Sequence, residues 1–150
     1  MPITKVSSPM ESTTMFTPVS ARAASAYKRV GAQTSVEGAS PHQVVCLLFE
    51  ALMQSLYSAR GCIDRGDLEG KGNALSKAVR ILDEGLKLSL DIESGGDLAL
   101  NLRGVYNYSI LQLTTANLKN DAALVDEVVQ LIAPVFDAWK SIAVSPVAKI

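Results

Sequence analysis

The sequence predicts an all-α protein, an antiparallel up-down bundle of four helices. Apolar residues recur every three or four positions, and no segment shows the strict alternation of a half-buried strand. Glycines, prolines and an Asn-Asp pair interrupt this rhythm, and residues able to cap a helix stand at the interruptions. The resulting loops are short, so consecutive helices must run in opposite directions.

The N-terminal region differs from the rest of the chain. Residues 1–20 are rich in Ser, Thr, Pro and Met and show little periodicity, which predicts a flexible tail. A short helix or cap is predicted over residues 21–35, and the sequence VEGA at 36–39 ends it. We expect residues 21–145 to form a single domain.

The first long helix is predicted over residues 41–65. Ser40 suits the N-cap, Pro41 suits the first helical position, and Gln43 completes a capping box. The Gly66-Asp67 turn ends this helix.

Three further helices follow, predicted over residues 68–91, 97–119 and 122–143. Asp67 and Asp121 provide N-caps for the first and last of them, and the Gly95-Gly96 pair separates the first from the second. Pro134 lies inside the last helix, where we expect a bend and not an end, because the apolar rhythm continues beyond it.

Composition argues against several partners. With 14 basic and 15 acidic residues the net charge is −1, whereas nucleic acids and anionic membranes attract clustered basic residues. No apolar run approaches the roughly 20 residues that span a membrane, and no secretory signal is expected. Two cysteines make no disulfide framework, which favours a cytoplasmic location. A mean hydropathy of +0.21 indicates apolar surface that is either buried or kept for a partner.

No catalytic, cofactor or metal site is predicted. His42 and Cys46 share a helix face, but a structural zinc site requires four ligands. We interpret the pair as a first-turn histidine and a buried cysteine. The glycine-containing segment 66–77 lacks the spacing of a phosphate-binding loop, and no strand precedes it. The protein is therefore expected to act by equilibrium binding and not as an enzyme.

The apolar face of the first helix is unusually wide. It covers roughly 240° of the helix circumference, whereas that of the fourth covers roughly 160°, a normal core stripe. Such a helix is either central or partly covered by another segment. Its apolar residues are Val44, Val45, Leu47, Leu48, Phe49, Ala51, Leu52, Met53, Leu56, Cys62 and Ile63.

The third helix carries two apolar stripes. Leu100, Leu111 and Leu118 lie almost opposite the first stripe, with Gly104 and Asn107 between them. Either the N-terminal segment around Tyr27 and Val30 packs over this second stripe, or a partner helix binds there. A tethered segment that a partner displaces would satisfy both interpretations. The first stripe comprises Leu98, Leu102, Val105, Tyr106, Leu113 and Ala116.

Taken in order, several segments resemble the flagellin-specific export chaperones, the FliS family. They are SAYKRV (25–30), ASPHQVVCLLFEAL (39–52), EGKGNALSKAVRILDEGLKLSLD (69–91), NLRGVYNY (101–108), ANLKNDAALVDEV (116–128) and DAWKS (137–141). The sequence departs from many members at 108–118, where those members are strongly basic.

The resemblance implies a cytoplasmic four-helix chaperone that binds the disordered C-terminal part of flagellin in hydrophobic grooves. Binding would prevent premature polymerisation and keep flagellin competent for flagellar type III export, with the export gate as a further partner. The resemblance places Tyr27 and Val30 in a displaceable N-terminal segment. By position it also assigns to the partner surface Leu47, Leu48, Ala51, Leu52, Tyr106, Asn107 and Asn117, beside Leu100, Leu111 and Leu118 from the second stripe.

Two other functions fit the same helices. One is a structural bundle that self-associates through the second stripe, which also allows a homodimer when no client is bound. The other is a helical adaptor for a different helical peptide. An enzyme or carrier with a ligand in the bundle core is disfavoured, because no inward pair of ligands is present.

Overall fold

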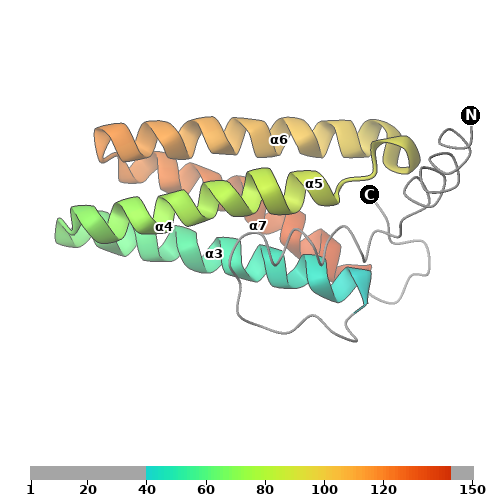
Figure 1. Ribbon diagram of the computed structural model, residues 1–150, viewed down its shortest axis with the longest axis horizontal. Coiled ribbons are helices and arrows are strands. Elements are labelled where there is room, and N and C mark those ends of the chain that lie inside the picture. Colours follow the sequence, from blue (N-terminus) through green and yellow to red (C-terminus); the bar gives the residue numbers. More distant parts are fainter. Residues whose placement is uncertain (1–39, 143–150) are drawn as a thin grey trace, which may run out of the picture.

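The computed structural model describes residues 40–142, and over this range the chain forms an antiparallel helical bundle (Figure 1). The predicted all-α class is confirmed. The tail 1–20, the helix 21–35 and residue 143 lie outside the described residues. The helical elements are α3 (Pro41–Arg65), α4 (Leu68–Arg80), the π-helix η1 (Ile81–Leu86), α5 (Lys87–Ser89), α6 (Ile92–Lys119) and α7 (Ala122–Ser141).

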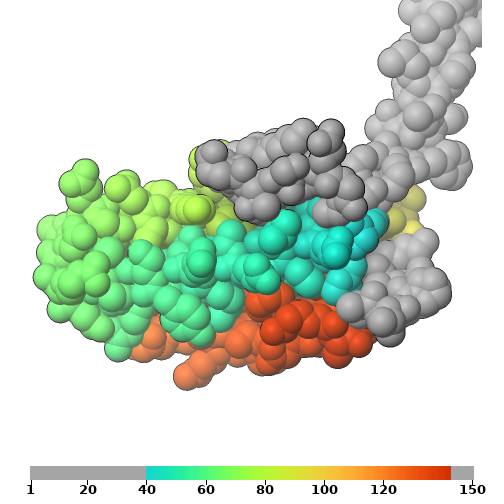
Figure 2. Space-filling model, turned by 90° about the horizontal axis from the view of Figure 1, so that it is seen from below, coloured from blue at the N-terminus to red at the C-terminus, as the bar shows by residue number. Residues whose placement is uncertain are grey.

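The helices form a ring in which α3 packs against α4 and α7, and α6 packs against the same two helices. The helices α3 and α6 therefore occupy opposite corners, at the lower and upper edges of Figure 1. The wide apolar face of α3 does not make this helix central. Its outer face runs along the surface beside α7 (Figure 2).

The predicted caps form as hydrogen bonds. Ser40 Oγ accepts from the Gln43 amide at 3.1 Å, and the Gln43 side chain accepts from the Ser40 amide at 2.9 Å. The carboxylate of Asp67 accepts from the Gly70 amide at 2.9 Å, and that of Asp121 from the Ala123 amide at 3.0 Å. These bonds satisfy amides that lack partners inside their own helices.

The second predicted helix, 68–91, runs without a break from Leu68 to Ser89, but part of it is π-helical. A π-helix over Ile81–Leu86 follows α4, and α5 ends at Ser89. A π-turn contains about one more residue than an α-turn. The neighbours Ile81 and Leu82, and then Gly85 and Leu86, are all buried. The side chain of Ser89 donates to the Gly85 carbonyl at 2.8 Å, so its hydroxyl is satisfied within the same segment.

The third predicted helix begins earlier than expected. It was predicted from residue 97, but α6 starts at Ile92, after Asp91 accepts from the Ser94 amide at 3.1 Å. The predicted Gly95-Gly96 break is present as a kink, because Gly96 adopts φ 56° and ψ −133°, a conformation that a Cβ disfavours. A helical turn therefore precedes the break.

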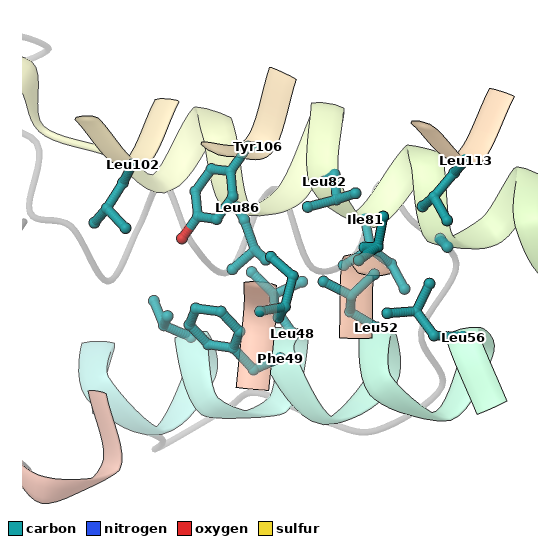
Figure 3. Close-up of a cluster of buried hydrophobic side chains, with 14 of the residues drawn as sticks. Leu48, Phe49, Leu52, Leu56, Ile81, Leu82, Leu86, Leu102, Tyr106 and Leu113 are labelled. Carbon is teal, nitrogen blue, oxygen red and sulfur yellow. The ribbon is translucent and has the colours of Figure 1, made fainter. Parts of the chain in front are cut away.

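The last helix continues through Pro134, as expected, and ends at Ser141. The core lies between the four helices and is built from leucines, isoleucine and aromatic rings (Figure 3). Lys71 is the only buried charged residue among residues 40–142. It donates to the Asn117 carbonyl at 2.9 Å and to the Asn120 side chain, where α6 ends. Over the described part of the chain, no helix is long and apolar enough to cross a membrane.

Candidate functional site

The outer face of α6 carries an exposed row of leucines, which we call the α6 stripe: Leu100, Leu111 and Leu118. Their exposed fractions are 41%, 60% and 81%. Spacings of 11 and 7 residues place all three on one side of an α-helix. Because the core side of α6 is formed by Leu102, Tyr106 and Leu113, the stripe points away from the bundle.

Small and polar residues separate the three leucines. Gly104 and Asn107 are exposed on the same side of α6. A Cβ built on Gly104 would have no heavy atom within 4 Å, so the surface is open at this point. An incoming helix could approach the backbone of α6 closely there, as small residues permit at helix contacts.

A hydrogen-bonded group borders the stripe on the side of α7. The Glu127 carboxylate accepts from the Tyr108 hydroxyl at 2.6 Å and from the Gln112 side chain at 2.8 Å. Both hydrogen bonds lower the pKa of Glu127, and the bond from Tyr108 has the larger effect. The same bond to Glu127 raises the pKa of Tyr108. This group links the outer edge of α6 to α7 beside the stripe.

A second apolar feature is a cavity of about 410 Å³ at the end of the bundle where α3 begins and α7 ends, which we call the end cavity. Its size lies in the range of pockets that hold small ligands or side chains. Its lining within residues 40–142 is Val45, Phe49, Leu86, Ser89, Leu90, Leu98, Leu102, Tyr106, Pro134, Val135, Ala138, Trp139 and Ile142.

Trp139 and His42 hold the two helix ends together beside this cavity. Their rings stack with centroids 5.0 Å apart. The indole Nε1 donates to the His42 carbonyl at 3.1 Å, and the imidazole Nε2 lies 2.6 Å from the Trp139 carbonyl oxygen. A bond at Nε2 requires the proton on that nitrogen, which leaves Nδ1 as the acceptor facing Cys46 Sγ at 3.7 Å.

The contacts of the Cys46–His42 pair are those of a structural pair, although Cys46 is half-buried and not buried as expected. Burial is the main cause that raises the pKa of the Cys46 thiol, with a contribution from Glu50. A raised pKa keeps the thiol protonated and weakly nucleophilic. No group of three or more potential metal ligands occurs in the described part of the chain.

The predicted partner residues fall into three groups. The first is exposed and comprises Leu100, Asn107, Leu111 and Leu118. The second lies in the core, where Leu48 and Leu52 are 0% exposed and Tyr106 is 3% exposed. The third is half-buried and comprises Leu47, Ala51 and Asn117.

Burial limits what the core residues of this set can do. Leu48 and Leu52 lie between the helices of the closed bundle (Figure 3), so a partner cannot reach them in this conformation. Asn117 offers its backbone carbonyl to Lys71 and thereby helps to end α6. Tyr27 and Val30 lie outside the described residues. The partner role of all of these residues stays a prediction.

The end cavity was not predicted from the sequence. Leu98 was assigned to the core stripe of the third helix, but it is 55% exposed and lines the cavity. Phe49 and Trp139 both line the cavity, although they are 90 residues apart in the sequence. Such a separation leaves no local signal.

Comparison with known proteins gives a consistent result. Residues 23–146 match the family described as "Flagellar protein FliS". The chain is 45% identical over 118 residues to the flagellar secretion chaperone FliS of Salmonella typhimurium, covering 79% of this chain and 87% of that protein. It is 39% identical over 126 residues to the FliS of Escherichia coli, covering 84% and 93% respectively. It is also 38% identical to FliSB of Pseudomonas aeruginosa, covering 78% and 92%. The chain belongs to the FliS family of flagellar secretion chaperones.

Proposed function

We propose that this protein is a cytoplasmic chaperone that binds the disordered C-terminal region of flagellin. Binding would prevent premature polymerisation and keep flagellin ready for type III export. The observation that carries the proposal is the α6 stripe, three exposed leucines on one face of a helix with an open glycine among them.

The physical argument concerns the cost of ordering a client. A disordered segment loses conformational entropy when it folds on a partner, and apolar burial must compensate for that loss. A preformed row of leucines offers such area without the hydrolysis of a nucleotide. An amphipathic helix of the client would present leucine-type side chains at spacings that match the stripe. No catalytic step is needed for this role, so we infer that the protein is not an enzyme.

The proposal is tested by titrating a flagellin C-terminal peptide into the protein and into two matched variants by calorimetry. Leu111→Asp places a charge in the middle of the stripe, and we expect a loss of at least roughly tenfold in affinity, as for truncation of a central interface residue. Tyr57→Asp, on the outer face of α3 where Tyr57 is 59% exposed, serves as the control and should bind like the parent. Loss of affinity in Tyr57→Asp but not in Leu111→Asp would place the client on α3 and contradict the assignment.

Self-association is the second candidate, because a second copy of the chain would also bury the α6 stripe. Sedimentation of the client-free protein distinguishes the two. A dimer that dissociates when the flagellin peptide is added indicates a shared surface, whereas a dimer that ignores the peptide favours the structural bundle. Docking of the loaded complex on the export gate is a further part of the proposal and requires the chaperone–client complex for its test.

A further inference from the structure

One hydroxyl, that of Tyr106, lies in the wall of the end cavity. The residue is 3% exposed, and its hydroxyl makes no hydrogen bond within residues 40–142. Its ring extends from α6 toward Phe49 of α3, with the oxygen beside Leu102 (Figure 3). An occupant of the cavity that carries an acceptor could therefore bind this hydroxyl. Burial raises the pKa of Tyr106, so this hydroxyl stays protonated and acts as a donor.

Within residues 40–142, the other lining side chains are apolar except those of Ser89 and Trp139. The Ser89 hydroxyl donates to the Gly85 carbonyl, and the Trp139 indole donates to the His42 carbonyl. The cavity therefore fits an occupant that has branched apolar side chains and one hydrogen-bond acceptor for Tyr106. An extended backbone with small aliphatic side chains meets this description, because each of its carbonyl groups is an acceptor.

The chain itself continues from the rim of this cavity. Ile142 is one of the lining residues, and residues 143–150 follow it with the sequence AVSPVAKI. This segment carries Val144, Val147 and Ile150. Eight residues span up to about 26 Å when extended, more than twice the roughly 10 Å diameter of a helix, so the segment is long enough to turn back over the cavity.

Pro146 suits this segment to an apolar site in two ways. A proline disfavours the α-conformation of the residue before it, here Ser145. It also lacks an amide N–H, which leaves one donor fewer to be satisfied inside a cavity with so few acceptors.

We propose that residues 143–150 bind back into the end cavity, with Val144 and Val147 against the apolar lining and a backbone carbonyl accepting from the Tyr106 hydroxyl. Covalent attachment at Ile142 gives the segment a high effective concentration, so weak contacts suffice. This intramolecular contact does not depend on the proposed function.

Trp139 reports on the contact, because it lines the end cavity and is the only tryptophan of the chain. We expect truncation after Ile142 to shift its emission to longer wavelength and to increase its quenching by acrylamide. The synthetic peptide AVSPVAKI, added in trans to the truncated protein, should reverse both changes. Tyr106→Phe in the truncated protein should weaken binding of the peptide roughly fivefold, the loss expected for one hydrogen bond.

Matched variants in the full-length chain keep the test independent of the truncation. Val144→Ser together with Val147→Ser should reproduce the shift in emission, whereas Leu118→Ser, on the surface of α6, should not. Unchanged Trp139 emission after truncation would overturn the proposal. A red shift caused by deletion of residues 1–39, but not by truncation after Ile142, would assign the cavity to the N-terminal segment and equally overturn it. None of these measurements uses flagellin, so their failure is distinct from failure of the proposed function.

Discussion

Gly70 and Gly72 lie two residues apart near the start of α4, but their surroundings differ. A Cβ on Gly70 would lie 2.7 Å from Cys62 Sγ and closer still to the carboxylate of Asp67, the N-cap of the same helix. A Cβ on Gly72 would meet no atom within 4 Å. The packing of α3 on α4 makes Gly70 the close-packing point.

Alanine substitutions at the two positions should therefore have opposite effects. Gly70→Ala must push aside the N-cap carboxylate and should destabilise the protein by about 1 kcal/mol, the typical cost of a lost cap. Gly72→Ala should stabilise it by about 0.5–1 kcal/mol, because alanine has the higher helix propensity. Urea unfolding followed by circular dichroism measures both. Equal effects at the two sites would contradict the difference in packing.

At the scale of elements, α6 has two faces that were both visible as apolar stripes. One is buried in the bundle, and the other is the exposed α6 stripe. The contact of α6 with α7 decides which of the two faces is buried and which is exposed. The Tyr108–Glu127–Gln112 group is the polar part of that contact. Ionised Glu127 thus adds two hydrogen bonds to the apolar packing that sets the orientation of the stripe.

This group predicts a pH dependence of stability with a definite sign. The pKa of Glu127 is lowered in the folded protein. Its contribution is therefore fully present above the ordinary glutamate value of about 4.3 and is lost as the pH falls through the lowered value. The raised pKa of Tyr108 acts in the opposite sense. That contribution is present below the ordinary tyrosine value of about 10 and is lost as the pH rises through the raised value.

Comparison of the parent protein with Glu127→Gln measures how much stability Glu127 contributes and how that contribution falls at low pH. We expect the parent to be more stable at pH 7 and the difference in stability to shrink as the pH falls below about 4. Glu50→Gln, at an exposed position on α3, is the matched control for the removal of one surface carboxylate. A constant difference between the parent and Glu127→Gln from pH 7 to pH 3 would show that ionised Glu127 does not contribute.

At the scale of the whole molecule, two leucines from the predicted partner surface have opposite environments. Leu48 is 0% exposed, and Leu111 is 60% exposed. We expect Leu48→Asp to destabilise the bundle by about 3 kcal/mol or more, because it buries an unpaired charge. Leu48→Met, which nearly conserves volume, should cost less than about 1.5 kcal/mol. Leu111→Asp should unfold like the parent. Thermal unfolding of the three variants is the measurement. A Leu48→Asp variant as stable as the parent would show that Leu48 is not a core residue.

The sequence by itself determined the local features of this protein: four helical segments, the cap at Ser40, the break at Gly95-Gly96 and the passage of the last helix through Pro134. Each depends on residues within a few positions of one another, so its signal is contained in a short window. The tertiary structure alone decided which apolar faces are covered. Leu48 and Leu111 are both apolar positions on their helices, and only the packing of distant helices buries one and leaves the other exposed. The end cavity belongs to the same class, because His42 and Trp139 beside it are 97 residues apart.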